Sequence, residues 1–459
     1  MAKIDNDLKE RYKDIDSDFY ERQVNSINPF RRWFHVNRYR IINNLVQGKF
    51  RKGMRVVDLG CGSCNWNTGR IEVFGIDLNE NLLKLAKDEF RLYDYKVGDV
   101  SDLGLNEGSF DMVLAIELLE HLHDYERLIR EINRILKPGG YAIVSVPFDT
   151  PFSLWRYLFF LQVLLHGYLL GEKYYRSRCG HMNFFSPDKL KDAFLRHNFE
   201  IDTVFDMRRF TIFLIARKNP VVVNTLSCED FTFILPTLNE GLNMRELLKN
   251  LVNYYKNAYI IVSDDGSIDN TKEIISEFKS DRIFFLDRTK EQLHGLTISV
   301  LEAIKLVKTE YFIVMDSDGQ HPWRKIEEFI NSLRLGNKLV LGSRIRVEGK
   351  WPLHRKIVSY GATFLGKISL LLRRKYYLSY DILSGFFGAE TSFFKKLAFD
   401  NIGMVKFRLK GVKILFDFLK IVPKDMWFGE VYYEFKAREY GNSKLNLKSY
   451  WEYFRSVFM

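Results

Sequence analysis

The sequence predicts an α/β protein made of two doubly wound domains, because short apolar runs alternate with helical stretches in both halves of the chain. The first half carries such runs at residues 56–59, 73–77, 112–115 and 141–146. The alternation restarts in the second half, with runs at residues 231–235, 259–263, 282–286, 311–315 and 339–342. Repetition of strand, helix and strand is typical of a mostly parallel sheet that is covered by helices.

Polar residues separate the two patterns and set the expected boundaries. Lys218-Asn219-Pro220 and the stretch 224–230 interrupt the alternation. A chain of 459 residues is long enough for two large domains. We expect an N-terminal helical extension at 1–50, a first domain at 51–218, a linker at 219–229 and a second domain at 230–459.

One long helix is predicted in the first half, before its fourth strand. Residues 122–136 repeat apolar side chains with the period of a helix, and Lys137-Pro138-Gly139-Gly140 follows them. Proline and glycine after a periodic stretch predict the end of the helix and a turn.

Basic and aromatic residues are both abundant. Lys and Arg together number 69 against 58 Asp and Glu, and aromatic residues make up 15% of the chain. This combination suits phosphate binding at a membrane interface or in a nucleic-acid groove. A mean hydropathy of −0.19 excludes a protein with many membrane spans. Because there are only four cysteines and no apolar leader, we expect a reducing, cytoplasmic setting.

A glycine-rich turn follows the first apolar run. Asp58 precedes Gly60 and Gly62, and glycine lets the backbone approach a ligand closely. Asp77 ends the next strand 19 residues later, where a carboxylate can accept hydrogen bonds from two ribose hydroxyls. Asp99 follows in Val97-Gly98-Asp99-Val100 and is placed to meet an adenine amino group.

This ordered set resembles the class I S-adenosylmethionine-dependent methyltransferases over residues 30–218. The resemblance implies a Rossmann-like domain that binds S-adenosylmethionine. It implies Asp58, Gly60 and Gly62 at the amino-acid end of the cofactor, Asp77 at the ribose, and Asp99 with Val100 at the adenine. The family usually has a third glycine where Cys64 stands.

Other residues of the first half leave their roles open. A methyl acceptor often needs a base, and Glu117, His121 and His181 are candidates. A helix-starting Glu and hydrogen-bonded histidines explain the same residues equally well. Cys61 and Cys64 form a C-x-x-C pair, but a zinc site needs four ligands and no second cysteine pair exists. We expect these two cysteines to line the turn.

Polar groups follow three strands of the second half, within residues 236–240, 263–271 and 316–322. Asp316 and Asp318 are two residues apart at a strand end, so their side chains face a common side. Carboxylate and amide oxygens suit Mg²⁺ or Mn²⁺ bound to a diphosphate.

The three segments resemble the GT-A-fold inverting glycosyltransferases, and specifically the dolichyl-phosphate mannose synthases, over nearly all of residues 230–459. The similarity continues through Gly342-Ser343-Arg344, Ser384 to Gly388 and Arg438 to Lys444, where Asn442 replaces the family's usual Glu. It implies nucleotide contacts from Pro236, Leu238, Glu240 and Asp265, metal ligands in Asp316, Asp318 and Gln320, phosphate contacts from Arg344, Arg438 and Lys444, and acceptor contacts from Arg355 and Ser359.

Two segments are candidates for contact with lipid. Residues 152–170 are long enough to cross a bilayer, but Arg156, Gln162 and His166 interrupt them, and residues 200–217 must return to the same sheet. We expect a lid or an in-plane helix there, with a helix buried under its own domain as the alternative. Residues 344–375 carry nine Lys or Arg against one acid, interleaved with apolar residues. They predict an amphipathic membrane-surface helix, with a solvated basic face as the alternative.

The leading hypothesis is a bifunctional enzyme that is peripheral at the cytoplasmic face of a membrane. It transfers a hexose, with mannose from GDP-mannose preferred, to polyprenyl or dolichyl phosphate, and it methylates a related lipid or glycan. Because related transferases often end in membrane spans and this sequence stops at Met459, a membrane-anchor protein is an expected partner, and nucleic acid is not.

Two alternatives stay open. The first domain could be a non-catalytic docking module, which Cys64 in place of glycine supports. A nucleic-acid methyltransferase is the other alternative, motivated by the net charge of +11.

Overall fold

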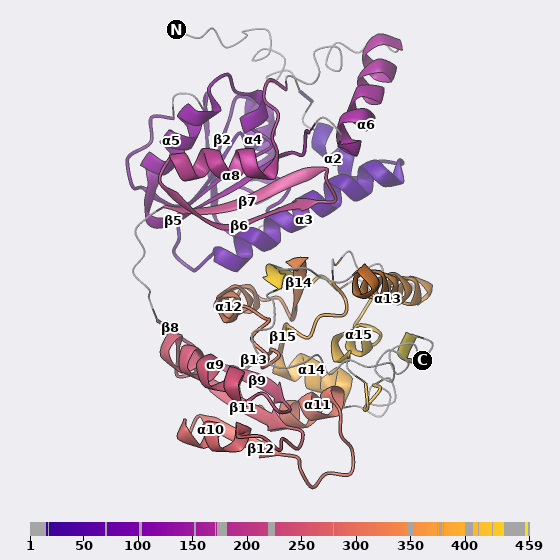
Figure 1. Ribbon diagram of the computed structural model, residues 1–459. Coiled ribbons are helices and arrows are strands. Elements are labelled where there is room, and N and C mark those ends of the chain that lie inside the picture. The colour runs from indigo at the N-terminus through magenta and orange to yellow at the C-terminus, as the bar shows by residue number, and fades with distance from the viewer. Residues whose placement is uncertain are drawn as a thin grey trace. The chain divides into compact units, whose positions relative to one another are not determined.

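The computed structural model shows two compact units, residues 1–222 and 223–459 (Figure 1). The described residues are 15–16, 18–68, 71–100, 103–150, 153–169, 171, 181–218, 225–278, 280–347, 353–373, 375, 379, 381–399, 407–411, 413–424, 426–435 and 455–457. Each unit contains a seven-stranded sheet of its own, so the predicted pair of α/β domains is confirmed.

The sheet of the first unit has the strand order β3-β2-β1-β4-β5-β7-β6. The first five strands in this order are parallel, and β7 runs antiparallel to both β5 and β6. The strands are β1 (Val56–Leu59), β2 (Val73–Asp77), β3 (Asp94–Val97), β4 (Phe110–Ile116), β5 (Leu136–Pro147), β6 (Phe199–Met207) and β7 (Thr211–Lys218). Parallel strands point their carboxyl ends to one edge of the sheet, which collects the residues after β1, β2, β3 and β4 there.

Polar caps start most helices of the first unit. Asn28, Asn79, Asp124 and Ser186 each accept a hydrogen bond from a backbone N–H in the first helical turn, which satisfies donors that have no partner within the helix. The helical elements are α2 (Phe19–Val24), α3 (Pro29–Lys49), α4 (Glu80–Asp88), η1 (Leu119–His121), α5 (Tyr125–Ile135), α6 (Leu154–Gln162), the π-helical turn η2 (Val163–Leu169) and α8 (Pro187–Arg196). Apolar residues of α5 and α8 pack together on one face of the sheet and form a single core with β1, β4, β5 and β7.

The start of β5 differs from the sequence prediction. The helix runs from Tyr125 to Ile135 within the predicted 122–136, but Leu136 already pairs with Phe110 of β4, and regular pairing resumes only at Tyr141. Gly139 takes a φ of +77° within this stretch. The segment expected to be a turn is therefore an irregular beginning of the strand, because neighbouring β4 supplies partners for its backbone.

The sheet of the second unit has the strand order β12-β11-β9-β13-β15-β14-β16. The first four strands are parallel, β15 is antiparallel to β13 and β14, and β16 is parallel to β14. The strands are β9 (Phe231–Thr237), β11 (Tyr259–Asp264), β12 (Ile283–Asp287), β13 (Tyr311–Val314), β14 (Leu339–Val347), β15 (Phe387–Glu390) and β16 (Gly429–Phe435), with a small separate pair of β8 (Leu226–Ser227) and β10 (Tyr255–Lys256).

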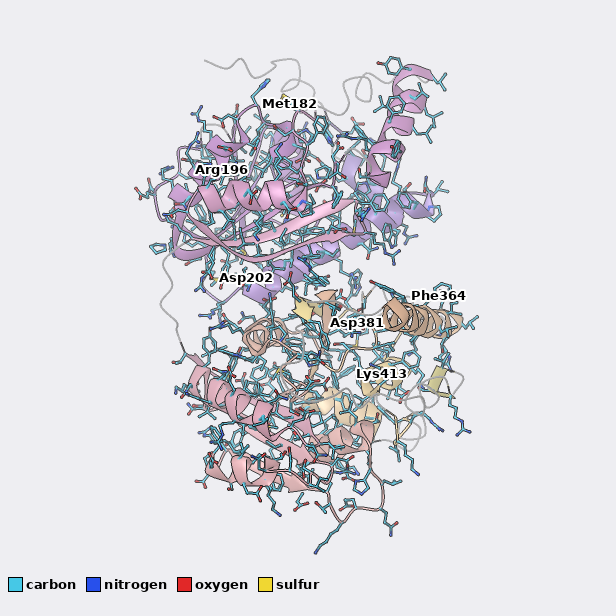
Figure 2. All side chains as sticks on the ribbon, in the orientation of Figure 1. Met182, Arg196, Asp202, Phe364, Asp381 and Lys413 are labelled. Carbon is cyan, nitrogen blue, oxygen red and sulfur yellow. The ribbon has the colours of Figure 1, made fainter. Side chains whose placement is uncertain are left out.

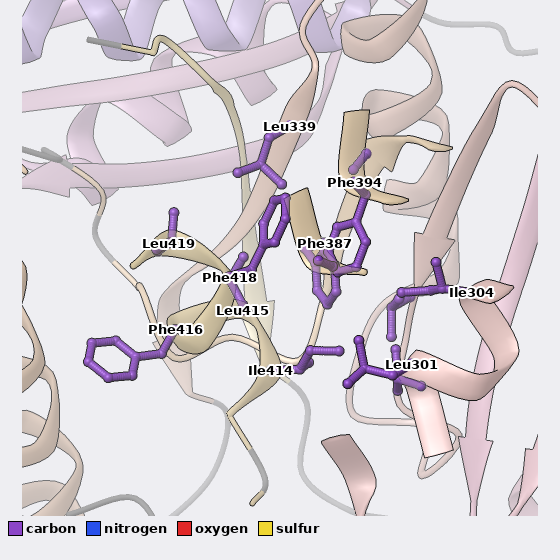
Figure 3. Packing of buried hydrophobic residues seen from close by; sticks show 14 of the residues in the cluster. Leu301, Ile304, Leu339, Phe387, Phe394, Ile414, Leu415, Phe416, Phe418 and Leu419 are labelled. Atoms are coloured by element: carbon purple, nitrogen blue, oxygen red, sulfur yellow. The ribbon is translucent and has the colours of Figure 1, made fainter. Parts of the chain in front are cut away.

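Two apolar cores flank this second sheet. One contains Phe387 of β15 together with Phe394 and Phe418 (Figure 3). The ring centroids of Phe394 and Phe418 are 4.1 Å apart. The other contains Phe233 of β9 with residues of α9 and α12. The helical elements are α9 (Gly241–Tyr254), α10 (Thr271–Glu277), α11 (Leu296–Leu306), η4 (Trp323–Lys325), α12 (Ile326–Arg334), α13 (Leu353–Leu372), α14 (Thr391–Ala398) and α15 (Ile414–Leu419). These cores fix the strand ends and loops that carry the polar residues of this unit.

Candidate functional site

A cavity of about 720 Å³ opens at the carboxyl ends of the strands in the first unit. Five of the six residues expected at the cofactor line it, namely Asp58, Gly60, Asp77, Asp99 and Val100. The sixth, Gly62, lies in the same turn, and its backbone N–H donates to Asp77 Oδ2 at 2.8 Å. The structure therefore brings the whole predicted set to one place.

The turn after β1 needs left-handed backbone at three positions. Gly60 and Gly62 have φ values of +65° and +52°, and Cys64 has a φ of +48°. A Cβ atom on Gly62 would lie 2.9 Å from the ring of Tyr20, so glycine also provides the room for close packing there. Cys64 thus adopts, at the place of the family's third glycine, the backbone conformation that favours glycine.

Asp58 is almost fully buried and only half satisfied. Its Oδ2 accepts a hydrogen bond from Trp66 Nε1 at 2.7 Å and a weaker one from Cys64 Sγ at 3.7 Å, whereas its Oδ1 is buried without a hydrogen-bond partner. Burial raises the pKa of Asp58 to about 7, against the pull of these two donors. Such a carboxylate gains strongly from a cation in the cavity.

The wall of the cavity that follows β4 holds four ionisable side chains, those of Glu117, Glu120, His121 and His181. Glu117 accepts from Arg38 Nη1 at 3.1 Å and from Ser145 Oγ at 2.9 Å, and it precedes η1 rather than starting a longer helix. The rings of His121 and His181 lie 4.9 Å apart. Burial, followed by the nearby His121, lowers the pKa of His181 to about 3, so this ring is neutral at physiological pH. The three sequence candidates for an acceptor site therefore meet at one cavity wall.

Glu120 is the residue of this wall that the sequence reasoning missed. Its side chain is only 1% exposed, and burial raises its pKa well above the usual range. The signal was present, because Glu120 stands directly before His121, but a glutamate after a strand is more often solvated. Cys61 and Cys64, by contrast, are separate thiols with raised pKa values owing to burial.

In the second unit, the residues after β13 form a tight loop. Asp316 donates its backbone N–H to His321 Nδ1 at 3.2 Å, and Asp318 Oδ1 accepts from the backbone N–H of Gln320 at 3.1 Å. Ser317 Oγ donates to the carbonyl of Pro236 at 2.9 Å, which fastens the loop to the end of β9. The three expected metal ligands and the expected nucleotide residue Pro236 are therefore carried by adjacent strand ends.

A charged cluster adjoins Asp316. Arg344 of β14 donates its Nε–H to the carboxylate of Asp381, and Lys413 donates to the carbonyl of Leu383 at 2.9 Å. Figure 2 labels Asp381 and Lys413 in the second unit. Burial alone would raise the pKa of Asp381, but Arg344 holds it below its ordinary value. Burial, with Arg344 nearby, lowers the pKa of Lys413. Arg344 and Lys413 both interact electrostatically with Asp316, so two cations face one of the expected metal ligands.

Asp381 and Lys413 could not be found from the sequence. Asp381 precedes the expected Ser384–Gly388 motif by three residues, and Lys413 stands before the short helix α15 without a motif of its own. Gly385 lets the backbone lie close to the loop that follows β13, because a Cβ atom at this position would lie 2.9 Å from Asp316 Oδ2.

The remaining expected nucleotide residues lie after β9 and β11. Leu238 is partly exposed and Glu240 is buried, with Asn243 Nδ2 donating to Glu240 Oε2 at 2.7 Å. Asp265 accepts from the backbone N–H of Gly295 at 2.7 Å and pairs with Arg288. Because β9 lies between β11 and β13, these residues share the edge that carries Asp316.

Some expected residues fall where the structure says little or nothing. Arg438, Asn442 and Lys444 lie outside the described residues. Arg355 lies in α13, but its side chain is outside the described part, and Ser359 of the same helix is partly exposed.

Two helical segments each present several apolar side chains to solvent. In α6 and η2 these are Tyr157, Phe160, Leu161, Leu164, Leu165, Tyr168 and Leu169. In α13 they are Tyr360, Phe364, Leu365, Ile368, Leu371 and Leu372, at the spacing of one helical face. Among the residues that the structure describes, no helix is both long and apolar enough to span a bilayer.

Phe159, Leu161 and Leu165 of the α6–η2 segment line the cavity of the first unit. Because this segment borders the cavity and also exposes apolar side chains, it is not a helix buried under its own domain.

Comparison with known proteins gives each unit a family. Residues 30–204 match the family model described as a methyltransferase domain, and residues 232–402 match that of glycosyl transferase family 2. The first unit is similar to a demethylmenaquinone methyltransferase of Staphylococcus aureus, with 32% identity over 168 residues that cover 32% of this chain and 69% of the relative.

The second unit is similar to proteins named dolichol-phosphate mannosyltransferase. The relative from Pyrococcus furiosus is 35% identical over 231 residues, which cover 49% of this chain and 62% of that protein. The relative from Mycosarcoma maydis is 29% identical over 249 residues, which cover 51% of this chain and 80% of that protein. The chain thus spans less than two thirds of the length of its Pyrococcus relative. From these matches and the two sheets, the chain is a fusion of a methyltransferase domain, its first unit, with a glycosyl transferase family 2 domain, its second.

Proposed function

We propose that the second unit transfers a hexose, mannose from GDP-mannose, to a polyprenyl or dolichyl phosphate with inversion at the sugar carbon. The observation that carries this proposal is the electrostatic interaction of Asp316, at the end of β13, with the cations Arg344 and Lys413. A carboxylate that faces two cations suits a site where metal-bound diphosphate meets a second phosphate. The names of the two mannosyltransferase relatives support the choice of sugar and lipid.

The residues present fit a divalent metal such as Mg²⁺ or Mn²⁺. Asp316 and Asp318 offer hard oxygen ligands in one loop, and Gln320 offers an amide oxygen. The missing side chain at Gly385 leaves Asp316 the room to reach an ion. Such a metal, when bound, neutralises charge that develops on the departing diphosphate.

The protein's own groups then bind and orient. Arg344 is held by Asp381, so its planar head keeps one direction while its remaining N–H groups can donate to phosphate oxygens. An acceptor phosphate is anionic at neutral pH, so no strong base is required, and rate enhancement rests on placement and charge.

For the first unit, we propose methyl transfer from S-adenosylmethionine to a related lipid or glycan. The cavity residues fit this cofactor, because the buried Oδ1 of Asp58 lacks a partner that a cationic amino group would supply. Asp77 ends β2 and lines the cavity, with Oδ2 accepting from the N–H of Gly62 and Oδ1 from that of Asn79, and we propose that it also accepts from the ribose hydroxyls. The cofactor supplies an electrophilic methyl group, and the protein supplies its position and the exclusion of water.

We further propose that the enzyme is peripheral at the cytoplasmic face of a membrane and has a membrane-anchor protein as a partner. The exposed apolar face of α13 supports the first part, since an amphipathic helix buries such a face in the lipid interface. The apolar α6–η2 segment supports it as well, because it reaches from the cavity wall to solvent.

The experiment combines the purified full chain, Mg²⁺ or Mn²⁺, labelled GDP-mannose and polyprenyl phosphate. We expect label in the organic phase, and we expect Asp316→Ala to abolish it while the exposed-site variant Asp281→Asn retains it. Absence of labelled lipid with every common sugar donor contradicts the proposed transfer. Calorimetry with S-adenosylmethionine tests the first unit separately, and an absence of binding there leaves a docking domain.

A further inference from the structure

The wall of the first unit's cavity holds three metal-ligating side chains from two separate segments. Glu120 and His121 belong to η1 after β4, and His181 belongs to the segment before α8. One oxygen of Glu120 and one ring nitrogen of each histidine all lie within 4.8 Å of one another. An ion about 2.0–2.2 Å from each of these atoms could contact all three after small side-chain rotations.

The backbone holds the two segments together. The carbonyl of Glu120 accepts from the backbone N–H groups of Met182 and Asn183 at 2.7 and 3.0 Å. The amide of Asn183 also donates to the carbonyls of Leu119 and Leu122. These bonds fix His181 beside η1 without using any of the three ligand side chains.

The carboxylate of Glu120 is the second observation that points to an ion. Both of its oxygens are buried without a hydrogen-bond partner, although Nε2 of His121 lies 3.7 Å from Oε1. Buried polar atoms almost always have partners, and a carboxylate without one is costly. A cation at this point would satisfy both oxygens, which none of the described protein groups does.

We propose that Glu120, His121 and His181 bind a divalent transition-metal ion. Two imidazole nitrogens and one carboxylate oxygen suit Zn²⁺ or a similar ion such as Co²⁺ better than Mg²⁺. Three protein ligands leave a coordination position open, and the site lines the same cavity as Asp58 and Asp77. This ion is distinct from the Mg²⁺ or Mn²⁺ proposed for the second unit.

The open position assigns the chemical class of the methyl acceptor, and this step rests on the proposed methyl transfer. An acceptor that bears a hydroxyl group fits, since its oxygen can bind the ion and lose its proton to water more readily. The oxygen then forms a bond to the methyl carbon, while the carbon–sulfur bond breaks and its electron pair stays on sulfur. The acceptor class is therefore an alcohol or phenol rather than an amine.

The test uses the full chain after removal of metal by a chelator. The probe is Co²⁺, followed by its visible absorption, with Zn²⁺ competition to give the affinity. We expect one Co²⁺ with a nitrogen-containing spectrum, in addition to any Co²⁺ at the oxygen ligands of the second unit, and at least about tenfold weaker binding at the nitrogen-containing site in both His181→Ala and Glu120→Gln. The exposed neighbour His123→Ala is the matched control, and Asp318→Asn removes the second unit's proposed site. Both of these variants should keep the spectrum.

Unchanged Co²⁺ affinity in His181→Ala and Glu120→Gln overturns the site, as does the absence of a nitrogen-containing spectrum in the unaltered chain. Calorimetry with S-adenosylmethionine on the same variants checks that they are folded and separates the two proposals. A metal that binds without any cofactor binding refutes the methyl transfer and keeps the metal site. Binding of S-adenosylmethionine without any binding of Co²⁺ at the histidines refutes the metal site and keeps the proposed methyl transfer.

Discussion

Trp66 Nε1 donates a 2.7 Å hydrogen bond to one oxygen of Asp58, while the other oxygen of this buried carboxylate has no hydrogen-bond partner among the residues that the structure describes. Burial holds the pKa of Asp58 near 7, so the group is mostly protonated at pH 5.5 and mostly ionised at pH 7.5. An ammonium group binds the ionised form. The affinity for S-adenosylmethionine should therefore rise roughly tenfold or more between these pH values, in proportion to the competent fraction.

Calorimetry at pH 5.5, 6.5 and 7.5 measures this rise. Above pH 8 the amino group itself loses its proton, with a pKa of about 7.7–8.0, and the affinity should fall again. The Asp58→Asn variant should bind S-adenosylmethionine weakly, and its affinity should not rise between pH 5.5 and 7.5. A flat profile in the unaltered chain would show that Asp58 does not meet the cofactor's cation.

The backbone at Cys64 gives a prediction about stability. A non-glycine residue in the left-handed region costs roughly 1–2 kcal/mol, and a β-branched residue fits there worst. Cys64→Gly should stay within about 1 kcal/mol of the unaltered chain, because relief of strain offsets the extra freedom of the unfolded chain. Cys64→Val should be less stable than Cys64→Gly by about 2 kcal/mol. Urea unfolding compares the pair, and equal stabilities would exclude a left-handed residue 64.

The close approach of Gly385 to Asp316 predicts a loss of sugar transfer. A Cβ atom at position 385 would lie 2.9 Å from Asp316 Oδ2 and would displace the carboxylate. Since small misplacements of reacting groups are costly, Gly385→Ala should lower transfer at least about tenfold. Gly361→Ala adds the same methyl group where nothing lies within 4 Å, and it should be active. Labelled lipid in the organic phase is the readout. Equal activities of Gly385→Ala and Gly361→Ala would contradict a role of Asp316 in sugar transfer.

The buried pair of Arg344 and Asp381 predicts an effect on stability. Asp381→Asn leaves Arg344 without its counter-ion, which should cost about 3–5 kcal/mol of unfolding free energy. Because Arg344 holds the pKa of Asp381 below its ordinary value, the pair stabilises the fold above the unfolded pKa of about 3.9 and is lost at lower pH. Denaturant unfolding at pH 7 and pH 3 measures this, with the exposed Asp281→Asn as the control. A similar free energy in both variants would contradict the ion pair.

The apolar face of α13 predicts binding to vesicles. Replacing both Tyr360 and Phe364 by Ser removes two exposed rings and should lower partition into anionic vesicles at least about tenfold. Phe90 and Ile268 are also exposed but lie outside this helix, so the double variant Phe90→Ser with Ile268→Ser should bind normally. Flotation through a density gradient gives the bound fraction. Equal losses in the two double variants would leave the face without a specific role.

Local sequence order predicted much of the fold and of the cofactor wall. Asp58, Asp77 and Asp99 each end or follow a strand, and parallel pairing then brings them together without further information. The prediction of a turn before β5 was wrong, because Leu136 gains a backbone partner in β4. A turn signal such as Pro138-Gly139 contains no information about that neighbouring strand.

The residues that the sequence did not reveal owe their roles to contacts between distant segments. Asp381 stands 37 residues from Arg344 in the sequence. Glu120 becomes part of a cluster only because the fold places His181 beside η1. Neither residue has a spacing motif that marks it. Burial and an orphaned carboxylate are properties of the folded chain, so a search along the sequence does not find them.

Tyr20 of α2 packs against the turn at Gly62, and the carbonyl of Ile15 accepts a hydrogen bond from Asn79 at 3.0 Å. Ile15, Phe19 and Tyr20 all line the cofactor cavity. If the first unit exchanges its cofactor past this wall, as the proposed methyl transfer requires, Ile15, Phe19 and Tyr20 must move to let it pass. The rate of that movement would then set an upper limit on the turnover of the proposed reaction.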